Sequence, residues 1–186
     1  MGRVHEPDAA WRTRFPDLFS ETYVAYAGCR TSFTTAAAPD PLVSRLHVVA
    51  VTPGGHVVVC RSDQDHRFLP GGTREPGETL LALARRELLE EAGAELVGDL
   101  RHVGSHVADS DRPAPYRPHL PHPQAHWSWA VADVRLAGAP TNPDDGETVV
   151  EVLTLPPHEA TDYLEVHDPV HAAIVRLAGA MGLLAA

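Results

Sequence analysis

Residues 71–93 constrain the fold more than any other stretch, because a glycine-rich turn leads there into a segment that ends in clustered carboxylates. Apolar residues recur in this segment at spacings of three and four, which predicts an amphipathic helix over residues 78–92. The predicted apolar stripe consists of Leu81, Ala84, Leu88 and Ala92. Gly93 can adopt the left-handed conformation that ends a helix. We therefore expect this helix to pack the stripe on the core of the domain.

Three glutamates, Glu87, Glu90 and Glu91, lie at positions i, i+3 and i+4 of this helix and should project together from a neighbouring face. Like charges at this spacing destabilise a helix, and anions near its carboxyl end oppose the helix dipole. Places that break local stability rules are expected to be functional. A divalent cation with oxygen ligands would convert the repulsion into binding. The pattern favours a metal site, and a solvated acidic face is the competing interpretation.

The same residues resemble the signature of the Nudix hydrolase family, G-x5-E-x7-R-E-U-x-E-E-x-G-U, in which U is aliphatic. Gly72 and Glu78 fill its first two fixed positions and residues 86–94 fill the rest, with Ala94 where a larger aliphatic residue is usual. The resemblance implies an α+β fold, in which a mixed, curved β-sheet is sandwiched between helices as α/β/α layers. It also implies a metal-dependent hydrolase that cleaves diphosphate linkages.

The resemblance further implies a role for each position of the motif. The ligands of Mg²⁺, or of Mn²⁺, would be Glu87, Glu90, Glu91 and the carbonyl of Gly71. These three glutamates are also the candidate catalytic residues, one of them as the base. Structural roles would fall to Glu78, Arg86, Gly72 and Gly93. Among these, Glu78 and Arg86 would form a salt bridge that fixes the loop against the helix.

A further acidic residue, Glu147, precedes a predicted strand at a place where members of this family carry extra carboxylates. We therefore predict that Glu147 is an additional metal ligand, and an ordinary polar loop is the alternative. Glu151 falls inside the predicted strand, where a solvent-facing position explains it equally well.

The composition excludes several classes of function. The formal net charge of -10 argues against a general nucleic-acid or anionic-membrane surface, because such surfaces need clustered basic residues. All 15 basic residues are arginine, so a lysine nucleophile or Schiff base is excluded. No apolar run is long enough to span a bilayer, and residues 1–10 lack the apolar core of a signal peptide. These features predict a cytoplasmic protein without membrane contact.

The chain is expected to form one Nudix hydrolase domain, residues 44–186, which ends in a C-terminal helix and is preceded by an extension, residues 1–43, that packs on the core. In the extension we expect a short helix within residues 8–19 and strand-like structure in residues 21–33. The strands expected in the domain are residues 45–51, 56–60, 67–69, 95–108, 125–136 and 148–155. The C-terminal helix is expected over residues 169–184.

A proline-rich segment, residues 109–124, separates the two longest predicted strands. Its prolines exclude a regular helix or central strand, and long loops in compact domains are usually functional. We predict that it binds an anionic substrate with a stackable ring through Arg112, Tyr116, Arg117, His119 and His122. Trp127 and Trp129 follow on one face of a strand, where either core packing or base stacking would explain them.

The leading hypothesis is a metal-dependent Nudix hydrolase that cleaves a diphosphate linkage in a nucleoside diphosphate joined to another moiety. Two alternatives stay open, namely a MutT-like nucleoside triphosphate pyrophosphohydrolase and a non-catalytic Nudix-fold domain that senses a ligand. In each case the expected partner is a small nucleotide or other diphosphate compound. A homodimer is left open as the assembly.

Overall fold

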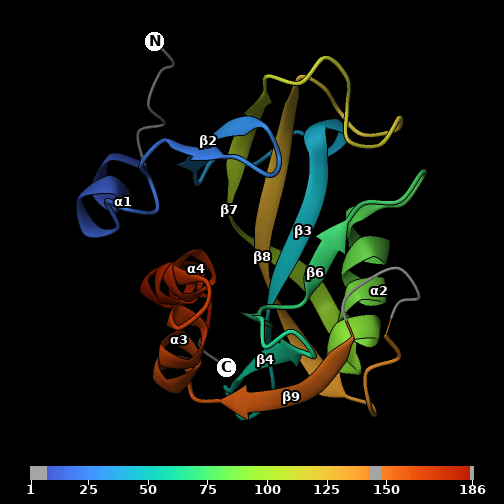
Figure 1. Ribbon diagram of the computed structural model, residues 1–186. Coiled ribbons are helices and arrows are strands. Elements are labelled where there is room, and N and C mark those ends of the chain that lie inside the picture. The colour runs from blue at the N-terminus through green and yellow to red at the C-terminus, as the bar shows by residue number, and fades with distance from the viewer. Residues whose placement is uncertain (1–7, 143–147, 185–186) are drawn as a thin grey trace.

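The computed structural model describes residues 8–142 and 148–184, in which nine strands form one sheet (Figure 1). The strands are β1 (Thr22–Val24), β2 (Cys29–Thr34), β3 (Val43–Val51), β4 (Val57–Ser62), β5 (Arg67–Phe68), β6 (Gly71–Thr73), β7 (Ala94–Ser110), β8 (Gln124–Leu136) and β9 (Val149–Leu155). The helices are α1 (Asp8–Arg14), the 3-10 helix η1 (Asp40–Leu42), α2 (Leu80–Ala92), α3 (Pro157–Glu165) and α4 (Pro169–Ala180).

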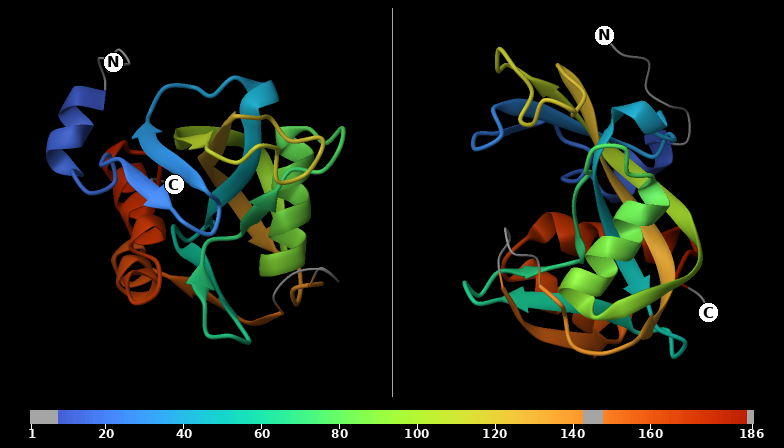
Figure 2. Two further views of the ribbon diagram at one scale, coloured as in Figure 1. Left: turned by 45° about the horizontal axis from the view of Figure 1, so that its top comes forward. Right: turned by 90° about the vertical axis from the view of Figure 1, so that its right-hand side faces the viewer.

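The sheet is mixed, because β3 and β8 are parallel while the other described pairs are antiparallel. Its strand order is β1-β2-β7-β8-β3-β4-β5, with β6 paired to β3 and β9 paired to β4. Figure 2 shows α2 on one side of the sheet and the α3/α4 pair on the other. The predicted α+β class with α/β/α layers is confirmed.

Side chains of β3 alternate between the two faces of the sheet, as the period of a strand requires. Val49 and Val51 pack in the cluster on the α3/α4 side. Val48 and Ala50 pack in the cluster on the α2 side. All four are buried, which explains why β3 is a nearly continuous apolar run and lies in the middle of the sheet.

An opening between β3 and β4 positions the predicted metal-binding segment. These strands pair at a single residue pair, Val51 with Val57, next to the tight turn that joins them. Farther along β3 its partner is instead β6, through the residues from Arg45 to His47. The backbone N–H of Val48 donates to the carbonyl of Pro70 at 2.8 Å. The glycine turn ahead of α2 therefore lies within the sheet, beside its central strand.

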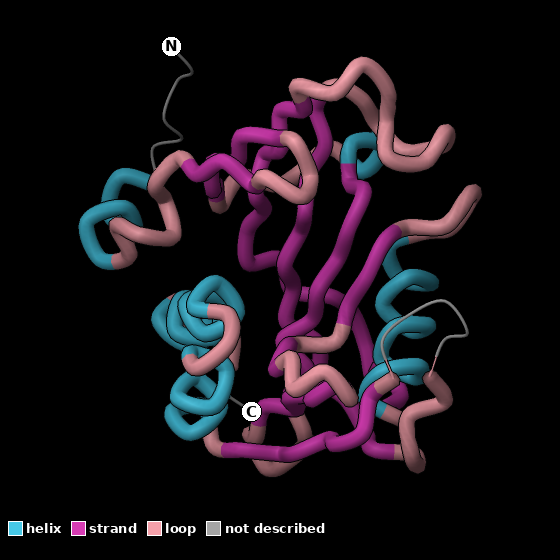
Figure 3. The backbone as a smooth tube through the Cα atoms, viewed as in Figure 1, coloured by secondary structure: helices cyan, strands magenta, loops and turns pink. Residues whose placement is uncertain are grey.

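The described part of the N-terminal extension continues this sheet. Residues 29–34 of β2 pair with residues 105–110 of β7, and β1 pairs with β2 (Figure 3). Helix α1 is fastened to the end of β2 by its buried Asp8, which accepts hydrogen bonds from Thr34 Oγ1 at 2.7 Å and from the backbone N–H of Thr35 at 2.8 Å. The extension thus shares the sheet of the domain and forms no separate layer.

Helix α2 is rotated relative to the orientation predicted from its sequence. Leu83 is buried, whereas Leu81 is only partly buried, so the predicted stripe was wrong at this position. The reason is that the inward face of α2 also contains Glu87, which is 5% exposed, and the half-buried Glu91. The carboxylates of Glu87 and Glu91 lie towards the sheet. The prediction counted only apolar residues, so it misplaced the centre of the inward face of α2.

Candidate active site

Helix α2 starts and ends at residues suited to these positions. The side chain of Thr79 accepts a hydrogen bond from the backbone N–H of Ala82 at 3.1 Å, which caps the first turn. Gly93 ends the helix with φ 57°, and a Cβ there would lie 2.2 Å from the carbonyl oxygen of Gly138. Only glycine fits this position. Both ends of the carboxylate-bearing helix are therefore fixed by local structure.

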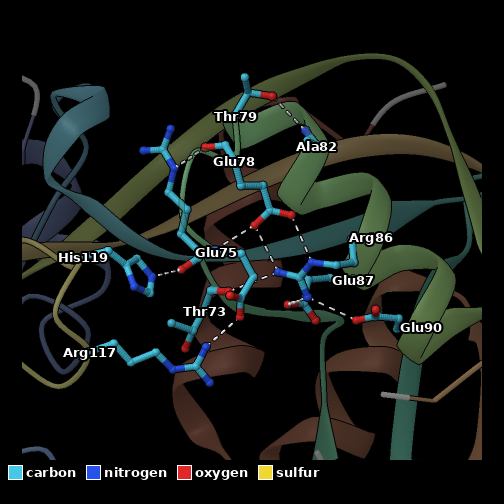
Figure 4. Close-up of polar contacts among 11 residues, drawn as sticks. Thr73, Glu75, Glu78, Thr79, Ala82, Arg86, Glu87, Glu90, Arg117 and His119 are labelled. Atoms are coloured by element: carbon cyan, nitrogen blue, oxygen red, sulfur yellow. Dashed lines mark hydrogen bonds and ion pairs between the residues drawn. The ribbon is translucent and has the colours of Figure 1, made fainter. Parts of the chain in front are cut away.

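Arg86 lies at the centre of the polar network that joins the glycine turn to α2 (Figure 4). Its Nε and Nη2 donate to the two carboxylate oxygens of Glu78 at 3.0 and 3.1 Å, and Nη2 also donates to the carbonyl of Thr73 at 3.1 Å. Desolvation raises the pKa of Glu78, but the hydrogen bonds from Arg86 and from the backbone N–H of Glu75, together with the charges of Arg86 and Arg74, outweigh it and lower that pKa. The salt bridge implied by the family resemblance is thus present and holds the loop on the helix.

The same guanidinium also contacts two of the three candidate metal ligands. Nη1 of Arg86 donates to Glu87 at 2.8 Å and to Glu90 at 3.1 Å. The third carboxylate, Glu91, accepts a hydrogen bond of 2.8 Å from the backbone N–H of Gly71. The structure therefore brings Gly71, Arg86 and the three glutamates together in one site.

Burial raises the pKa of two of these glutamates. The pKa of Glu87 is raised to about 7, mainly by desolvation, although Arg86 opposes the shift. The pKa of Glu91 is raised to about 8, again mainly by desolvation, with the charges of Glu87 and Glu90 adding to it and the hydrogen bond from Gly71 opposing it. Ionisation of Glu87 and Glu91 is thus unfavourable in the metal-free protein, mainly because both carboxylates are desolvated.

Gly72 allows the carboxylate of Glu87 to lie directly against the turn. A Cβ at this glycine would lie 2.3 Å from Oε1 of Glu87. Gly71 is equally constrained, since a Cβ there would lie 2.3 Å from the carbonyl oxygen of Leu46. Gly71 is therefore required by its close packing against the backbone of β3, whereas Gly72 leaves the space that the carboxylate of Glu87 occupies.

The donor set fits a hard divalent cation. Across residues 8–142 and 148–184 the side chains form no ready-made group of three His, Cys, Asp or Glu arranged around a common point. In α2 the reason is local, because Arg86 lies between Glu87 and Glu90. Three carboxylates, two of them with raised pKa values, are nevertheless the oxygen ligands that Mg²⁺ and Mn²⁺ prefer.

Three cavities share lining residues in series from Glu91 outwards, and we refer to the three together as the groove. An inner cavity of about 290 Å³ is lined by Glu91, a middle cavity has about 350 Å³, and an outer cavity of about 310 Å³ reaches the proline-rich loop. The residues shared by the inner and middle cavities are His47, Asp168 and His171. Those shared by the middle and outer cavities are Tyr26, Arg45 and Trp127. The inner cavity therefore has the carboxylates of Glu91 and Asp168 among histidines and Arg67, and the outer half of the groove is aromatic.

Neutral histidines surround the inner half of the groove. His47 stacks on Trp129 with a centroid distance of 4.8 Å, and its buried Nδ1 has no hydrogen-bond partner in the described structure. The indole N–H of Trp129 donates to Nδ1 of His106 at 3.1 Å, so this nitrogen carries no proton. Desolvation lowers the pKa of His106 to about 4, and it lowers the pKa of His47 and His171 as well.

The residues predicted to bind substrate are divided by the structure into two groups. Arg112 and Tyr116 line the outer cavity. Arg112 donates to the carbonyl of Tyr26 at 2.5 Å, and its own carbonyl lies 2.9 Å from Nε2 of His122. Arg112 therefore braces the wall of the cavity, and His122 supports Arg112.

Arg117 and His119 instead join the proline-rich loop to the turn ahead of α2 (Figure 4). Nη1 of Arg117 lies 2.6 Å from Oε1 of Glu75, and Nε2 of His119 lies 2.8 Å from the carbonyl of Arg74. Neither residue lines the three cavities of the groove. In this structure their contacts are with the protein and hold the loop beside the site.

The two tryptophans have different roles, although they alternate on one face of β8. Trp129 is 4% exposed, belongs to the core and lines only the middle cavity, whereas the half-buried Trp127 lines the middle and outer cavities. Glu147, predicted as a metal ligand, lies outside the described residues. Glu151 is engaged elsewhere, since it accepts a hydrogen bond of 3.0 Å from Nε of Arg61.

Sequence reasoning missed the residues that connect Glu91 to the aromatic half of the groove. These residues are Tyr26, Arg45, His47, Asp168 and His171. The alternation of Arg45 and His47 along a predicted strand could have placed both on one face. Their proximity to Tyr26 and His171 depends on long-range packing and has no local signal.

Comparison with known proteins agrees with the fold and with the motif. A family model described as NUDIX domain matches residues 41–177. Since this match covers most of the chain, the protein belongs to the Nudix hydrolase family, and the resemblance noted in its sequence is confirmed. The protein is a Nudix hydrolase by family. The matched region begins just before β3, so α1, β1 and β2 precede it.

Several solved structures share the fold at low sequence identity. A mutant form of the Bacillus subtilis pyrophosphohydrolase BsRppH superimposes with a TM-score of 0.63 at 15% identity, covering 89% of this chain and 99% of that chain. A NUDIX hydrolase from Nitrosomonas europaea gives a TM-score of 0.53 at 17% identity, covering 74% and 90%. The E. coli ORF135 protein gives 0.50 at 19% identity, covering 78% and 96%.

The search of curated proteins finds no match for this sequence. Among the described residues, no helix has both the length and the apolar character needed to cross a membrane.

Proposed function

We propose that this protein is a divalent-metal-dependent pyrophosphohydrolase that cleaves a diphosphate linkage in a nucleoside diphosphate joined to another moiety. The observation that carries the proposal is the series of three cavities with shared lining residues, in which Glu91 lines the first, His47 the first two and Trp127 the last two. A substrate with charged phosphates at one end and a planar ring at the other matches this arrangement. The pyrophosphohydrolase activity in the name of the Bacillus subtilis structure is consistent with it.

Nudix hydrolases generally need divalent metals, and the residues that would hold Mg²⁺ or Mn²⁺ here are Glu87, Glu90, Glu91 and the carbonyl of Gly71. When bound, the cation would neutralise charge on the phosphates and lower the pKa of a water molecule. Glu91 is held by the N–H of Gly71, and desolvation raises its pKa to about 8 in the metal-free protein; a bound cation would lower this pKa and favour the carboxylate form that accepts a proton. Glu91 is therefore our proposed base.

The protein itself supplies positioning and exclusion of water. Arg86 and Glu78 hold the glycine turn against α2, so that Gly71 stays within hydrogen-bonding distance of Glu91. The stacked pair of His47 and Trp129 forms a side of the middle cavity next to the carboxylates. Preorganised positioning of this kind accounts for much of the catalysis of phosphoryl transfer.

The test is a substrate panel assayed with Mg²⁺ and with Mn²⁺, with products identified by ion-exchange chromatography. The panel contains nucleoside diphosphate sugars, dinucleoside polyphosphates, dinucleotides and the nucleoside triphosphates. Release of a nucleoside monophosphate from a diphosphate-linked compound supports the proposal. A parallel reaction with Glu91→Gln controls for contaminating phosphatases.

Two other outcomes would support the competing functions. Preferential conversion of triphosphates to monophosphate and pyrophosphate would identify a MutT-like enzyme. Saturable binding without turnover under any metal condition would identify a sensor domain. The cytoplasmic location, the lack of nucleic-acid and membrane partners, the homodimer and the role of Glu147 stay predictions.

A further inference from the structure

We propose that the β1–β2 hairpin and the proline-rich loop together form a nucleobase-binding site, in which Tyr26 and Tyr116 hold the base over Arg45 and Trp127. The hairpin precedes the region matched by the Nudix family model, residues 41–177. The inference rests on the proposed function for the identity of the substrate. It assigns recognition of the base to a part of the chain outside the matched region.

The hairpin and the loop are fastened together at several points. Arg112 donates to the carbonyl of Tyr26 at 2.5 Å, and the backbone N–H of Asp111 donates to the carbonyl of Gly28 at 3.0 Å. The hydroxyl of Tyr23 donates to Oδ2 of Asp111 at 2.8 Å. A Cβ on Gly28, whose φ is 61°, would lie 2.7 Å from Nε of Arg112. The two segments therefore form one continuous wall.

The outer cavity enclosed by this wall is lined by aromatic rings from three parts of the chain. Tyr26 comes from the hairpin, Tyr116 from the proline-rich loop, and Trp127 from β8. Tyr26 and Tyr116 are 73% and 74% exposed. Exposed aromatic residues on both sides of a cavity are costly in water, and they are typical of sites that stack a planar ligand.

The other residues that line the outer cavity suit a nucleobase better than a purely apolar ring. The guanidinium of Arg45 lies 5.6 Å from the centroid of Trp127, and both residues line the cavity. A planar guanidinium stacks on bases as well as on aromatic side chains. Thr73 also lines the cavity; its hydroxyl accepts a hydrogen bond of 3.4 Å from Nε of Arg45 and can donate its own proton to the edge of a base.

The spacing along the sheet suits a nucleoside. In the pairing of β3 with β8, Arg45 lies beside Trp127 and His47 lies beside Trp129. His47, two residues farther along β3, lines the inner cavity together with Glu91. Two residues along a strand span about 7 Å, which leaves room for a sugar between a base at Trp127 and phosphates near Glu91. The outer cavity, of about 310 Å³, is at the small end of the range of ligand sites, so it accommodates one ring system.

The experiment measures the binding of adenosine, guanosine, cytidine and uridine to the full chain by saturation-transfer NMR titration, with ribose as the comparison. These probes lack phosphate, so their binding requires neither a metal nor hydrolysis. We expect at least one nucleoside to bind about tenfold more tightly than ribose, the gain typical of stacking a base.

The variants Tyr26→Ala and Tyr116→Ala should each weaken binding of that nucleoside about tenfold while leaving ribose unchanged. Tyr26→Phe and Tyr116→Phe keep the ring and should retain the wild-type affinity. Val166→Ala, at a residue that is 72% exposed and does not line the groove, is the matched control. Thermal unfolding of every variant verifies the fold.

The inference is overturned if no nucleoside binds more tightly than ribose, or if both alanine variants bind nucleosides as the wild type does. Hydrolysis of a panel substrate together with either result would leave the proposed function intact. Conversely, nucleoside binding that depends on Tyr26 and Tyr116, in a protein that hydrolyses nothing in the panel, would support the base site and contradict the proposed function.

Discussion

The backbone N–H of Leu69 donates a hydrogen bond of 2.9 Å to Nδ1 of His171. Gly71 follows two residues later, and its own backbone N–H donates a hydrogen bond to Glu91. The C-terminal helix α4 is thereby connected to the segment that orients a candidate catalytic carboxylate. Because the accepting Nδ1 carries no proton, His171 is neutral with its proton on Nε2.

Replacing His171 by leucine should lower both stability and turnover. The leucine fills a similar volume but leaves the N–H of Leu69 buried without an acceptor, so we expect the free energy of unfolding to fall by about 1–3 kcal/mol. His171→Asn places an oxygen near the position of Nδ1 and should recover part of both losses. Urea denaturation and kcat are the measurements. If His171→Leu keeps the wild-type free energy of unfolding and the wild-type kcat, the hydrogen bond between Leu69 and His171 does not position the site.

Arg86→Ala should reduce stability as well as rate, because Arg86 holds the glycine turn through Glu78 and partly compensates Glu87. Removing one member of such a partly buried network should cost about 2–4 kcal/mol of unfolding free energy. The matched control is Arg85→Ala, at the exposed neighbouring position of the same helix, and it should change neither stability nor rate. An Arg86→Ala protein with wild-type stability but no activity would instead assign Arg86 to substrate binding.

Glu87→Gln should abolish turnover and stabilise the metal-free protein above neutral pH. The pKa of Glu87 is about 7 in the folded protein and near 4.5 in the unfolded chain. Below pH 4.5 the residue is protonated in both states and does not affect the free energy of unfolding. As the pH rises from 4.5 to 7, ionisation in the unfolded chain lowers the free energy of unfolding. The variant should therefore be more stable at pH 8 by about 2–3 kcal/mol, with no advantage at pH 4. Chemical denaturation in EDTA at both pH values measures the difference, and the exposed Glu159→Gln is the control. Equal stability of Glu87→Gln and wild type at pH 8 would show that ionisation of Glu87 does not oppose folding.

The elements with strong local signals could be predicted from the sequence. The turn after β3, the helix α2 with its Gly93 terminus, and the long strands β7 and β8 all follow from apolar periodicity and turn residues. Helix α3 was missed because it starts at Pro157 directly after Pro156, which resembles a loop. Proline is nevertheless favoured in the first turn of a helix.

The candidate site was predicted only as far as the motif extends. Glu78 and Arg86 are eight residues apart and face each other because of the turn and helix that the motif itself specifies. The groove has a different origin, since His47 and His171 come together through packing of α4 on the sheet. The contact between the guanidinium of Arg112 and the hairpin carbonyl of Tyr26 has no local signal either, and substrate binding by Arg112 stays a prediction. Contacts between distant segments leave no periodic pattern in the sequence.

The double variant Arg117→Ala, His119→Ala should raise KM more than it lowers stability. Both residues join the proline-rich loop to the turn at Arg74 and Glu75, and they line none of the three cavities. Their loss should loosen the wall of the outer cavity and change the ranking of substrates in the panel. Unchanged affinities and ranking would show that the loop only connects β7 and β8.

The most direct test of the central claim is the kcat of Glu91→Gln compared with wild type, measured on the best panel substrate across a Mg²⁺ titration. Glutamine keeps an oxygen to accept the N–H of Gly71, so the fold should be retained while the base is lost. We predict a fall in kcat of about 10²–10⁴-fold that saturating Mg²⁺ does not restore. A kcat equal to wild type at saturating Mg²⁺ would remove Glu91 from the mechanism and contradict the account.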